Sequence, residues 1–310
     1  MKKKTFAKVL SLALAALMLF ALCACGAAET PAAEPTAAPA ADAPASEAPA
    51  ETEAPAESQG VLDQIKASGE LHITLSPDFA PMEFIDSSKD GQEQYVGLDV
   101  FLAKYIADYI GVKLVIEPMS FDACQTAVYT ASVPMSVSGY VWTEERAESY
   151  EISDYYYDGD NKIEPVILIR TADAEKYTSS EDFNGVDIGA QNASLQMQLV
   201  TSQLPDANPV AVGDVGTGVL ELQNGSIEAL AVAKGNAEII MDANPDLVLC
   251  PWEFTITEET EAFVILITKG ETALLNVVNE ALAKAYREGM YGAWHDEAVA
   301  LAKVVNGTEE

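Results

Sequence analysis

Along residues 60–305, segments in which hydrophobic residues recur with the two-residue period of strands alternate with segments that have the period of helices. This pattern predicts strands and helices in turn. Leu71–Ser76 and Lys113–Glu117 have the two-residue period of strands. Between them, Asp99 can cap a helix that ends at Gly111, where a left-handed residue is favoured. The apolar positions predicted to share one face of this helix are Phe101, Leu102, Ile106, Tyr109 and Ile110.

The same pattern continues to the end of the chain. A helix over residues 123–131 and the strand Met135–Ser138 complete the first run, and a second run begins near Lys162. Its predicted elements are the strands Pro165–Ile169, Val186–Ala190 and Glu228–Val232, and the helices Ser194–Leu204 and Thr217–Gln223, the latter stopped by Asn224-Gly225. A tail helix carries one apolar stripe of Leu274, Val277, Val278, Ala281, Leu282 and Ala285. Two strand–helix runs and a returning tail predict an α/β protein with two lobes.

The N-terminus has the organisation of an export signal. Three lysines at Lys2–Lys4 precede an apolar run, which is shorter than the roughly 20 residues that span a bilayer. The segment Leu22-Cys23-Ala24-Cys25-Gly26 resembles a bacterial lipobox, which implies a signal peptide over residues 1–24 and a lipid on Cys25. The alternative is a retained single-span anchor.

A low-complexity segment follows over residues 25–58. Beyond Cys25 it is rich in Ala, Pro and acidic residues and contains no aromatic residue, Leu, Ile or Val. Such a composition has nothing to bury, so we expect a disordered tether between the lipid and the folded part.

Charge and cysteine usage narrow the function further. The chain has 49 acidic and 17 basic residues and a formal net charge of −32, which excludes nucleic acid as a partner. Cys124 and Cys250 are too few for a disulfide scaffold, and we interpret them as buried free thiols rather than as a bridge. The only histidines, His72 and His295, lack the spacing of a metal site, so no metal or other cofactor is expected.

Three segments carry a family resemblance. They are Ser76–Phe84 followed by Gly97–Val100, Ser138–Arg146 continuing to Ser153–Tyr156, and Leu222–Ala229 followed by Ile267–Gly270. In this order and spacing they resemble the family 3 extracellular solute-binding proteins, the polar amino-acid receptors of ABC importers. The resemblance covers residues 60–305.

This resemblance implies a type II periplasmic-binding-protein-like flytrap, with a ligand cleft between two lobes. Lobe 1 would comprise residues 59–157 and 258–310, and lobe 2 residues 158–257. The expected ligand is a small carboxylate, an amino acid or an amino-acid-like compound, which cleft closure would present to an ABC transporter permease. We expect an exported monomer at the outer face of the bacterial plasma membrane, in contact with the membrane through its lipid alone.

Arg146 is the principal candidate for binding this ligand. Thr143 is a good N-cap, and Glu144 and Glu145 suit the first helical turn, which places Arg146 at the third helical position. A guanidinium there can hold a carboxylate by two parallel hydrogen bonds, and the resemblance assigns it the ligand α-carboxylate. The alternative is a surface arginine paired with Glu144 or Glu148.

Five further residues are candidates for ligand contact. Ser138 and Gly139 are expected at a strand end, where backbone groups can approach a ligand, although Gly139 also suits a tight turn. By resemblance, Phe79 and Phe121 would sandwich the ligand side chain; the alternative is an ordinary core position. Ser194 begins a predicted helix and could complete the carboxylate clamp.

Three positions depart from the family pattern. Val141 and Leu195 stand where the family usually or often has hydroxyl residues, and Ala233 replaces the Asp that normally binds the ligand α-amino group. A buried ammonium without a carboxylate partner is costly. Therefore either another acid serves, or the ligand lacks an ordinary α-amino group.

No arrangement of residues in the sequence indicates catalysis. There is no Ser-His-Asp order, metal cluster or phosphate loop, so a binding protein is favoured over an enzyme. Two alternatives stay open: a dehydratase, because a few members of this fold act on small carboxylates, and a sensor without transport.

Overall fold

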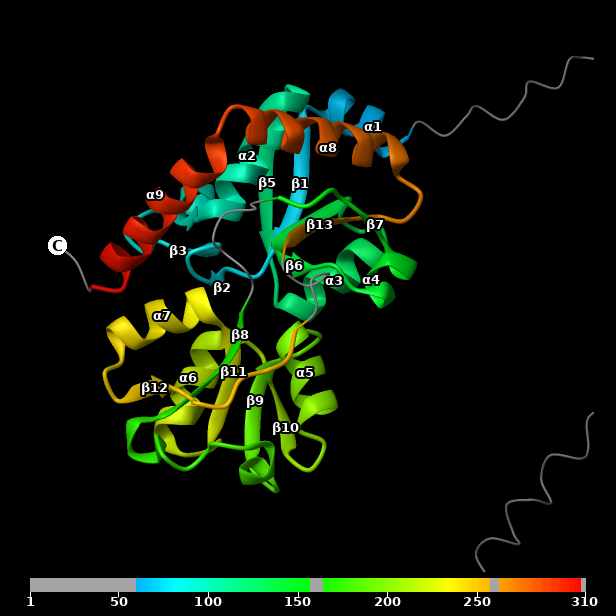
Figure 1. The fold of residues 1–310 in the computed structure, drawn as a ribbon. Coiled ribbons are helices and arrows are strands. Elements are labelled where there is room, and N and C mark those ends of the chain that lie inside the picture. Colours follow the sequence, from blue (N-terminus) through cyan, green and yellow to red (C-terminus); the bar gives the residue numbers. More distant parts are fainter. Residues whose placement is uncertain (1–59, 157–163, 257–261, 308–310) are drawn as a thin grey trace, which may run out of the picture. The chain divides into compact units, whose positions relative to one another are not determined.

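The structure, a computed structural model, describes residues 60–156, 164–256 and 262–307. The predicted signal peptide, Cys25 and the whole predicted tether lie outside these residues, as do the predicted lobe crossings after Tyr157 and near residue 258. The described residues belong to one compact unit. They contain two separate five-stranded sheets with helices around each (Figure 1).

The first sheet mixes parallel and antiparallel strands, and we call it and its helices lobe 1. Its strands, in spatial order, are β5 (Lys113–Pro118), β1 (Glu70–Leu75), β6 (Met135–Val141), β13 (Phe263–Ile267) and β7 (Glu151–Ile152). Strand β1 pairs in parallel with β5 and β6, whereas β13 is antiparallel to β6 and β7. Thus a strand from the last sixth of the chain completes a sheet built from its first half.

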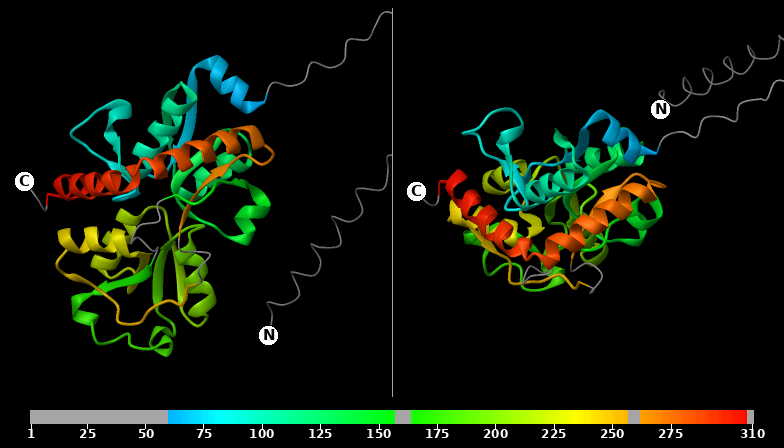
Figure 2. Two further views of the ribbon diagram at one scale, coloured as in Figure 1. Left: turned by 45° about the horizontal axis from the view of Figure 1, so that its top comes forward. Right: turned by 90° about the horizontal axis from the view of Figure 1, so that it is seen from above.

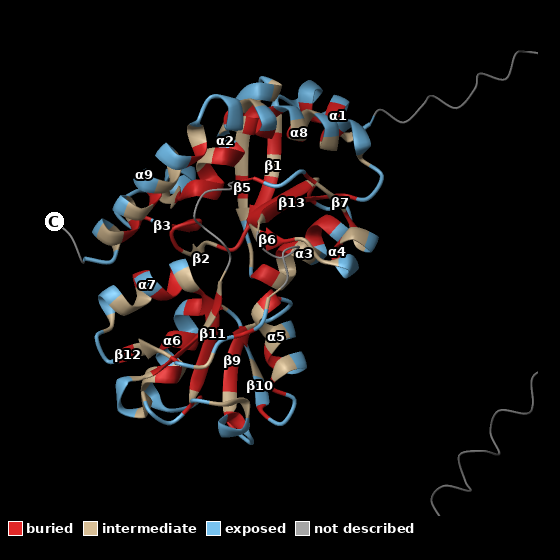
Figure 3. Ribbon diagram, viewed as in Figure 1, coloured by how far each residue is buried: buried red, intermediate tan, exposed pale blue. Residues whose placement is uncertain are grey.

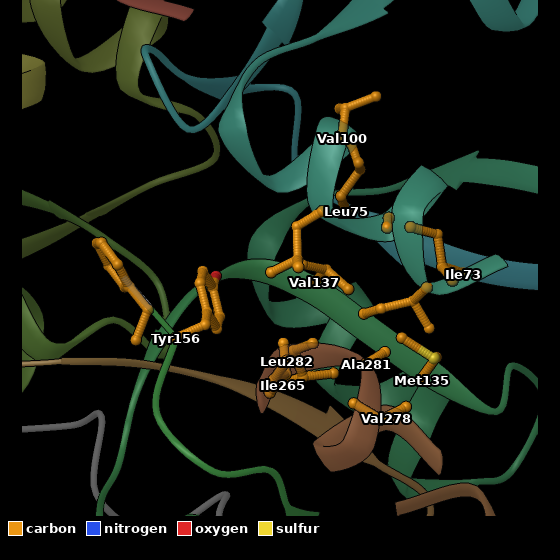
Figure 4. Close-up of a cluster of buried hydrophobic side chains, with 14 of the residues drawn as sticks. Ile73, Leu75, Val100, Met135, Val137, Tyr156, Ile265, Val278, Ala281 and Leu282 are labelled. Atoms are coloured by element: carbon orange, nitrogen blue, oxygen red, sulfur yellow. The ribbon is translucent and has the colours of Figure 1, made fainter. Parts of the chain in front are cut away.

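Six helices of the described residues belong to lobe 1. They are α1 (Val61–Ser68), α2 (Leu98–Ile110), α3 (Phe121–Tyr129), α4 (Glu144–Ser149), α8 (Thr272–Arg287) and α9 (Met290–Val305). Helices α8 and α9, orange to red in Figure 2, both contact α2. Five of the six residues predicted for the tail stripe are buried in α8, namely Leu274, Val278, Ala281, Leu282 and Ala285, whereas Val277 is half-buried. Figure 4 shows three of these side chains packed with residues of β1, β6 and β13.

Helix α2 corrects two details of the prediction. Its N-cap is Gly97, and Asp99 lies inside the first turn with its carboxylate buried. The carboxylate accepts hydrogen bonds from the Gly139 N–H and the Tyr156 hydroxyl, so it joins α2 to β6 and to Tyr156 and does not cap the helix. Tyr109 is 39% exposed and lies off the buried face. Gly111 ends the helix in the left-handed conformation, as predicted.

The second sheet, with its helices, forms lobe 2. Its strands, in spatial order, are β10 (Asn208–Val212), β9 (Asp187–Gln191), β11 (Ala229–Ala233), β8 (Pro165–Arg170) and β12 (Leu247–Leu249). Its helices are α5 (Leu195–Gln203), α6 (Val215–Asn224) and α7 (Lys234–Ala243). The strands predicted for this run are confirmed to within one residue at each end. Buried residues concentrate on the strands of both sheets, and exposed residues on the outer helix faces (Figure 3).

A small antiparallel sheet lies beside α2 in lobe 1. It consists of β2 (Asp78–Phe79), β3 (Glu83–Ile85) and β4 (Tyr95–Val96), and the sequence analysis did not predict it. The α2 start packs directly on it: the N–H of Leu98 donates to the Pro81 carbonyl and the N–H of Asp99 to the Met82 carbonyl. At Gly97 (φ 121°), a Cβ would lie 2.3 Å from the Met82 carbonyl oxygen, so only glycine permits this approach.

One side chain pairs with part of the outer edge of the lobe 1 sheet. Gln92 lies in the short 3-10 helix η1 (Gly91–Gln94) beside β5, which is an edge strand. Its amide nitrogen donates to the Ile116 carbonyl, and its amide oxygen accepts from the Ile116 N–H at 2.6 Å. The side chain thereby occupies both backbone groups of that residue.

Candidate functional site

A cavity between the two lobes brings together five of the six candidate ligand-binding residues. The empty space at the cavity, including open solvent at its mouth, is about 450 Å³. Strand, loop and helix-start residues from both lobes line it. They are Ser76, Asp78, Phe79, Glu83, Phe121, Gly139, Val141, Arg146 and Phe263 of lobe 1, and Gln191, Ser194, Leu195 and Gln196 of lobe 2.

Arg146 is held as the sequence predicts. The Thr143 side chain accepts a hydrogen bond from the Arg146 N–H, which makes Thr143 the N-cap of α4. The guanidinium donates to the Val141 carbonyl at 2.8 Å and, across the lobes, to the Ala193 carbonyl at 3.1 Å. Its Nε donates to the Gln125 side chain at 3.4 Å. Of its five N–H groups, one on each terminal nitrogen donates to no described residue.

The guanidinium is buried without a counter-ion. Arg146 is 4% exposed and forms no ion pair with a described carboxylate, which corrects the alternative of a surface pair with Glu144 or Glu148. Burial lowers the pKa of Arg146. Its positive charge stacks over the rings of Tyr140 and Phe121, at 5.3 and 5.9 Å from their centroids. A buried cation with spare N–H groups beside a cavity is suited to an anionic ligand.

Both candidate aromatic residues lie in the cavity wall. Phe121 begins α3 and packs 4.9 Å from the ring of Tyr140, so it also belongs to the core of lobe 1. Phe79 meets Phe263 edge to face at 6.5 Å. The sequence analysis did not single out Phe263, because it lies on the returning strand β13, far from the motifs.

Ser138 and Gly139 differ from expectation in position. They lie inside β6 and not at its end, since the strand continues to Val141. Ser138 does not line the cavity: its hydroxyl donates to Glu83 Oε1 at 2.6 Å and accepts from the Ser76 N–H. Gly139 lines the cavity with φ 55°, and a Cβ there would lie 2.7 Å from the Phe79 ring. Its N–H is already used by Asp99.

Ser194 is the N-cap of α5, at the lobe 2 side of the cavity. Its hydroxyl accepts a hydrogen bond from the Met197 N–H at 3.1 Å, and the residue is buried. Leu195 and Gln196, the first residues of the helix, complete this wall. The free N–H groups of a helix start favour a negative group of a ligand here.

Two acids that the sequence analysis did not identify as site residues line the same cavity. Asp78 joins the lobes, because its Oδ2 accepts from the Gln191 side chain at 2.8 Å and from the Val215 N–H at 2.7 Å. Glu83 is fully buried in β3. Both acids lie within the motif Ser76–Phe84, in a segment that is otherwise mostly apolar. Acidic residues in such a segment could have identified them as site candidates from the sequence.

Glu83 and Asp99 form a buried carboxyl pair under the cavity. Burial raises the pKa of Asp99 to about 7, against hydrogen bonds from Gly139 and Tyr156 that lower it. Burial, together with the neighbouring Asp99, raises the pKa of Glu83 well above its usual range. Two close carboxyl groups in a low-dielectric site cannot both ionise readily, so the pair retains a proton near neutral pH.

A second cavity adjoins the first across Phe79 and Phe263, and its empty space, including open solvent, is about 390 Å³. Ala233 and Lys234 line it where lobe 2 contributes the start of α7. Lys234 forms an ion pair with Glu164. The position where the resemblance implies an acid is thus occupied by the neutral Ala233, with Lys234 beside it.

The two cysteines are buried and unpaired, as predicted. Cys124 Sγ lies 2.9 Å from the Thr74 hydroxyl, and burial raises the pKa of its thiol to about 11. Within the described ranges, no three His, Cys, Asp or Glu side chains are grouped so as to hold a metal ion.

Comparison with known proteins places this geometry in context. The family described as bacterial extracellular solute-binding proteins, family 3, matches residues 71–298. The probable histidine-binding protein of Campylobacter jejuni is 25% identical over 240 residues, which cover 75% of this chain and 88% of the relative.

Solved structures agree with the two-lobe fold. An amino acid ABC transporter substrate-binding protein from Streptococcus pneumoniae, bound to L-arginine, has a TM-score of 0.71 and 31% identity, covering 78% of this chain and 98% of the other. The ancestral amino acid-binding protein AncCDT-1, a precursor of cyclohexadienyl dehydratase, has a TM-score of 0.66 and 27% identity, covering 77% and 99%.

Proposed function

Because this chain belongs to family 3 of the bacterial extracellular solute-binding proteins, we propose that it captures an amino acid or amino-acid-like carboxylate for an ABC importer. The observation that carries the proposal is the buried Arg146 guanidinium, which borders the cavity without a described carboxylate partner. Its two spare N–H groups receive the ligand carboxylate. Phe79 and Phe121 pack on the rest of the ligand.

Cleft closure couples capture to delivery. Arg146 belongs to lobe 1 and Ser194 to lobe 2, so a carboxylate held by both stabilises the closed arrangement through contacts with each lobe. The closed form then presents both lobes to the permease. Gly139 keeps the lobe 1 wall thin enough for the Phe79 ring to pack against its backbone.

The expected setting is the outer face of the bacterial plasma membrane, where the exported monomer is tethered by a lipid on Cys25. The lipobox-like segment after the apolar run supports this. In the part of the chain that the structure describes, every helix falls short of the length and apolar character that crossing a membrane requires.

Binding, not turnover, is the proposed activity. A dehydratase is the second candidate. The similarity to AncCDT-1 favours it, and so does the pKa of Glu83, which burial raises well above its usual range, since a buried carboxyl group can act as a general acid. Incubation with small carboxylates should return them unchanged; dehydration of any of them would favour the enzyme.

We predict that one compound of an amino-acid and organic-acid panel raises the melting temperature of the protein. A ligand at 100 times its dissociation constant stabilises the folded state by about 2.7 kcal/mol. Differential scanning fluorimetry across the panel is the measurement. A panel in which no carboxylate shifts the transition would contradict the proposed function.

Ala233→Asp should strengthen the binding of common α-amino acids. The substitution restores an acid where the family normally binds the α-amino group, and neighbouring Lys234 already pairs with Glu164. Isothermal titration with the best ligand of the panel measures the change. Unchanged affinity would show that the α-amino group is bound elsewhere.

A further inference from the structure

Glu83 has an oxygen to which no described N–H or hydroxyl group donates. Its Oε1 accepts the Ser138 hydroxyl, and its buried Oε2 has no such donor; the carboxyl group of Asp99 is the hydrogen-bonding neighbour of Glu83 that remains. The side chain is 0% exposed and lines the cavity that Arg146 borders. No described Lys, Arg or His lies within 4.0 Å of it. An unsatisfied buried carboxyl oxygen at a cavity is suited to a donor that arrives with the ligand.

Asp78, the other acid that lines the cavity, has no oxygen without a donor. Asp78 Oδ1 accepts the Ser76 hydroxyl at 2.6 Å, and Oδ2 accepts from Gln191 and from the Val215 N–H. Its carboxylate is already used to join the lobes. Glu83 is therefore the acid with capacity for a ligand.

The groups facing Glu83 favour a proton on it when the site is empty. Asp99 of α2 and Asp78 of β2 are acidic neighbours, and both raise the pKa of Glu83. Cys124 of α3, Tyr140 of β6 and Tyr156 are buried, and burial raises the pKa of each above its usual value, so they stay neutral. Among the described residues that line the cavity, Arg146 is the buried cation, and it is engaged with backbone carbonyls.

We infer that Glu83 supplies the negative half of the ligand site, and that the ligand's ammonium or guanidinium group displaces a proton which Glu83 and Asp99 share when the site is empty. On binding, the carboxyl O–H bond breaks, the proton leaves to solvent, and the ligand cation takes its place beside the carboxylate. This inference rests on the proposed function, in which Arg146 holds the ligand carboxylate. It supplies the acid that Ala233 does not.

Capture of an amino acid is then linked to pH. L-Arginine and L-glutamine keep their ammonium and carboxylate groups ionised between pH 5 and 7, so a pH dependence reports on the protein. Release of one proton per ligand makes the dissociation constant about tenfold larger for each pH unit of acidification below the pKa of the empty pair.

The test is isothermal titration of the full chain with L-arginine, L-glutamine and succinate at pH 6, in phosphate and in Tris. The difference in apparent enthalpy between the two buffers gives the number of protons released. We expect about one proton per amino acid, and weak or absent binding of succinate. Glu83→Gln should abolish proton release and weaken amino-acid binding at least tenfold. The matched control, Asp86→Asn just after β3, should release the same number of protons as the wild type.

Several results would overturn the inference. Amino-acid binding with no proton release, or with a dissociation constant that does not change between pH 5 and 7, excludes the displaced proton. Binding of succinate without any amino acid removes Glu83 from ligand recognition but leaves carboxylate capture standing. Failure of all three compounds and of the wider panel overturns the proposed function as well. If Glu83→Gln does not fold, the wild-type proton count decides.

Discussion

Arg146→Ala is expected to weaken binding of the preferred ligand about 100-fold or more. Removing one partner of a buried, hydrogen-bonded charge pair costs about 2–5 kcal/mol of binding free energy or more. A 100-fold weaker affinity corresponds to about 2.7 kcal/mol. Isothermal titration, or loss of the ligand-induced rise in melting temperature, measures the effect. Arg146→Lys should recover only part of it, because an ammonium cannot reproduce the two parallel hydrogen bonds.

The ligand-free protein should keep nearly its original melting temperature in Arg146→Ala. The substitution removes hydrogen bonds to the carbonyls of Val141 and Ala193, but it also removes a buried charge without a described counter-ion. Arg170→Ala is the matched control: Arg170 pairs with Asp173 and donates to two lobe 2 carbonyls, away from the cavity. It should lower stability and leave affinity unchanged. A large loss of stability in ligand-free Arg146→Ala would assign Arg146 a structural role.

Gly97→Ala is expected to destabilise the protein by about 3 kcal/mol or more. The new Cβ would meet the Met82 carbonyl oxygen at 2.3 Å, and its φ of 121° is strained for any other residue. The start of α2 would have to move, and Asp99 and its bond to Gly139 would move with it. Denaturant titration followed by circular dichroism gives the change in unfolding free energy.

Gly111→Ala separates crowding from backbone strain. Gly111 has φ 87°, but a Cβ there meets no described atom within 4 Å. Only the left-handed conformation is then penalised, at about 1–2 kcal/mol. Equal losses in the two variants would show that α2 does not depend on its close approach to Met82.

The sequence predicts the periodic elements of this fold well. The strand Pro165–Arg170, the buried stripe of α8 and the glycine ends of α2 and α6 follow from local spacing and local backbone preference. Strands β2, β3 and β4 do not, because two or three residues carry no period. The pairing of β13 with β6 also depends on contacts between distant segments.

The candidate site also contains residues whose positions follow from local sequence and residues whose positions do not. Thr143 and Arg146 lie within one turn, so local capping predicts the backbone position of Arg146 in α4. Glu83, Asp99 and Phe263 come together only through packing of β3, α2 and β13, which no local pattern encodes. The prediction that Asp99 is an N-cap was wrong for the same reason. Its carboxylate accepts hydrogen bonds from two groups distant in sequence, the Gly139 N–H and the Tyr156 hydroxyl, and not from the start of its own helix.

The amide of Gln92 has a consequence for crowded conditions. A bare sheet margin offers unpaired N–H and carbonyl groups to any extended chain nearby, and such margins nucleate aggregation. Here the Gln92 side chain forms with Ile116 the two hydrogen bonds that a neighbouring strand would form. The opposite edge strand of the sheet, β7, is only two residues long. The edge N–H and carbonyl of Ile116 are therefore not available to pair with the sheet of another molecule.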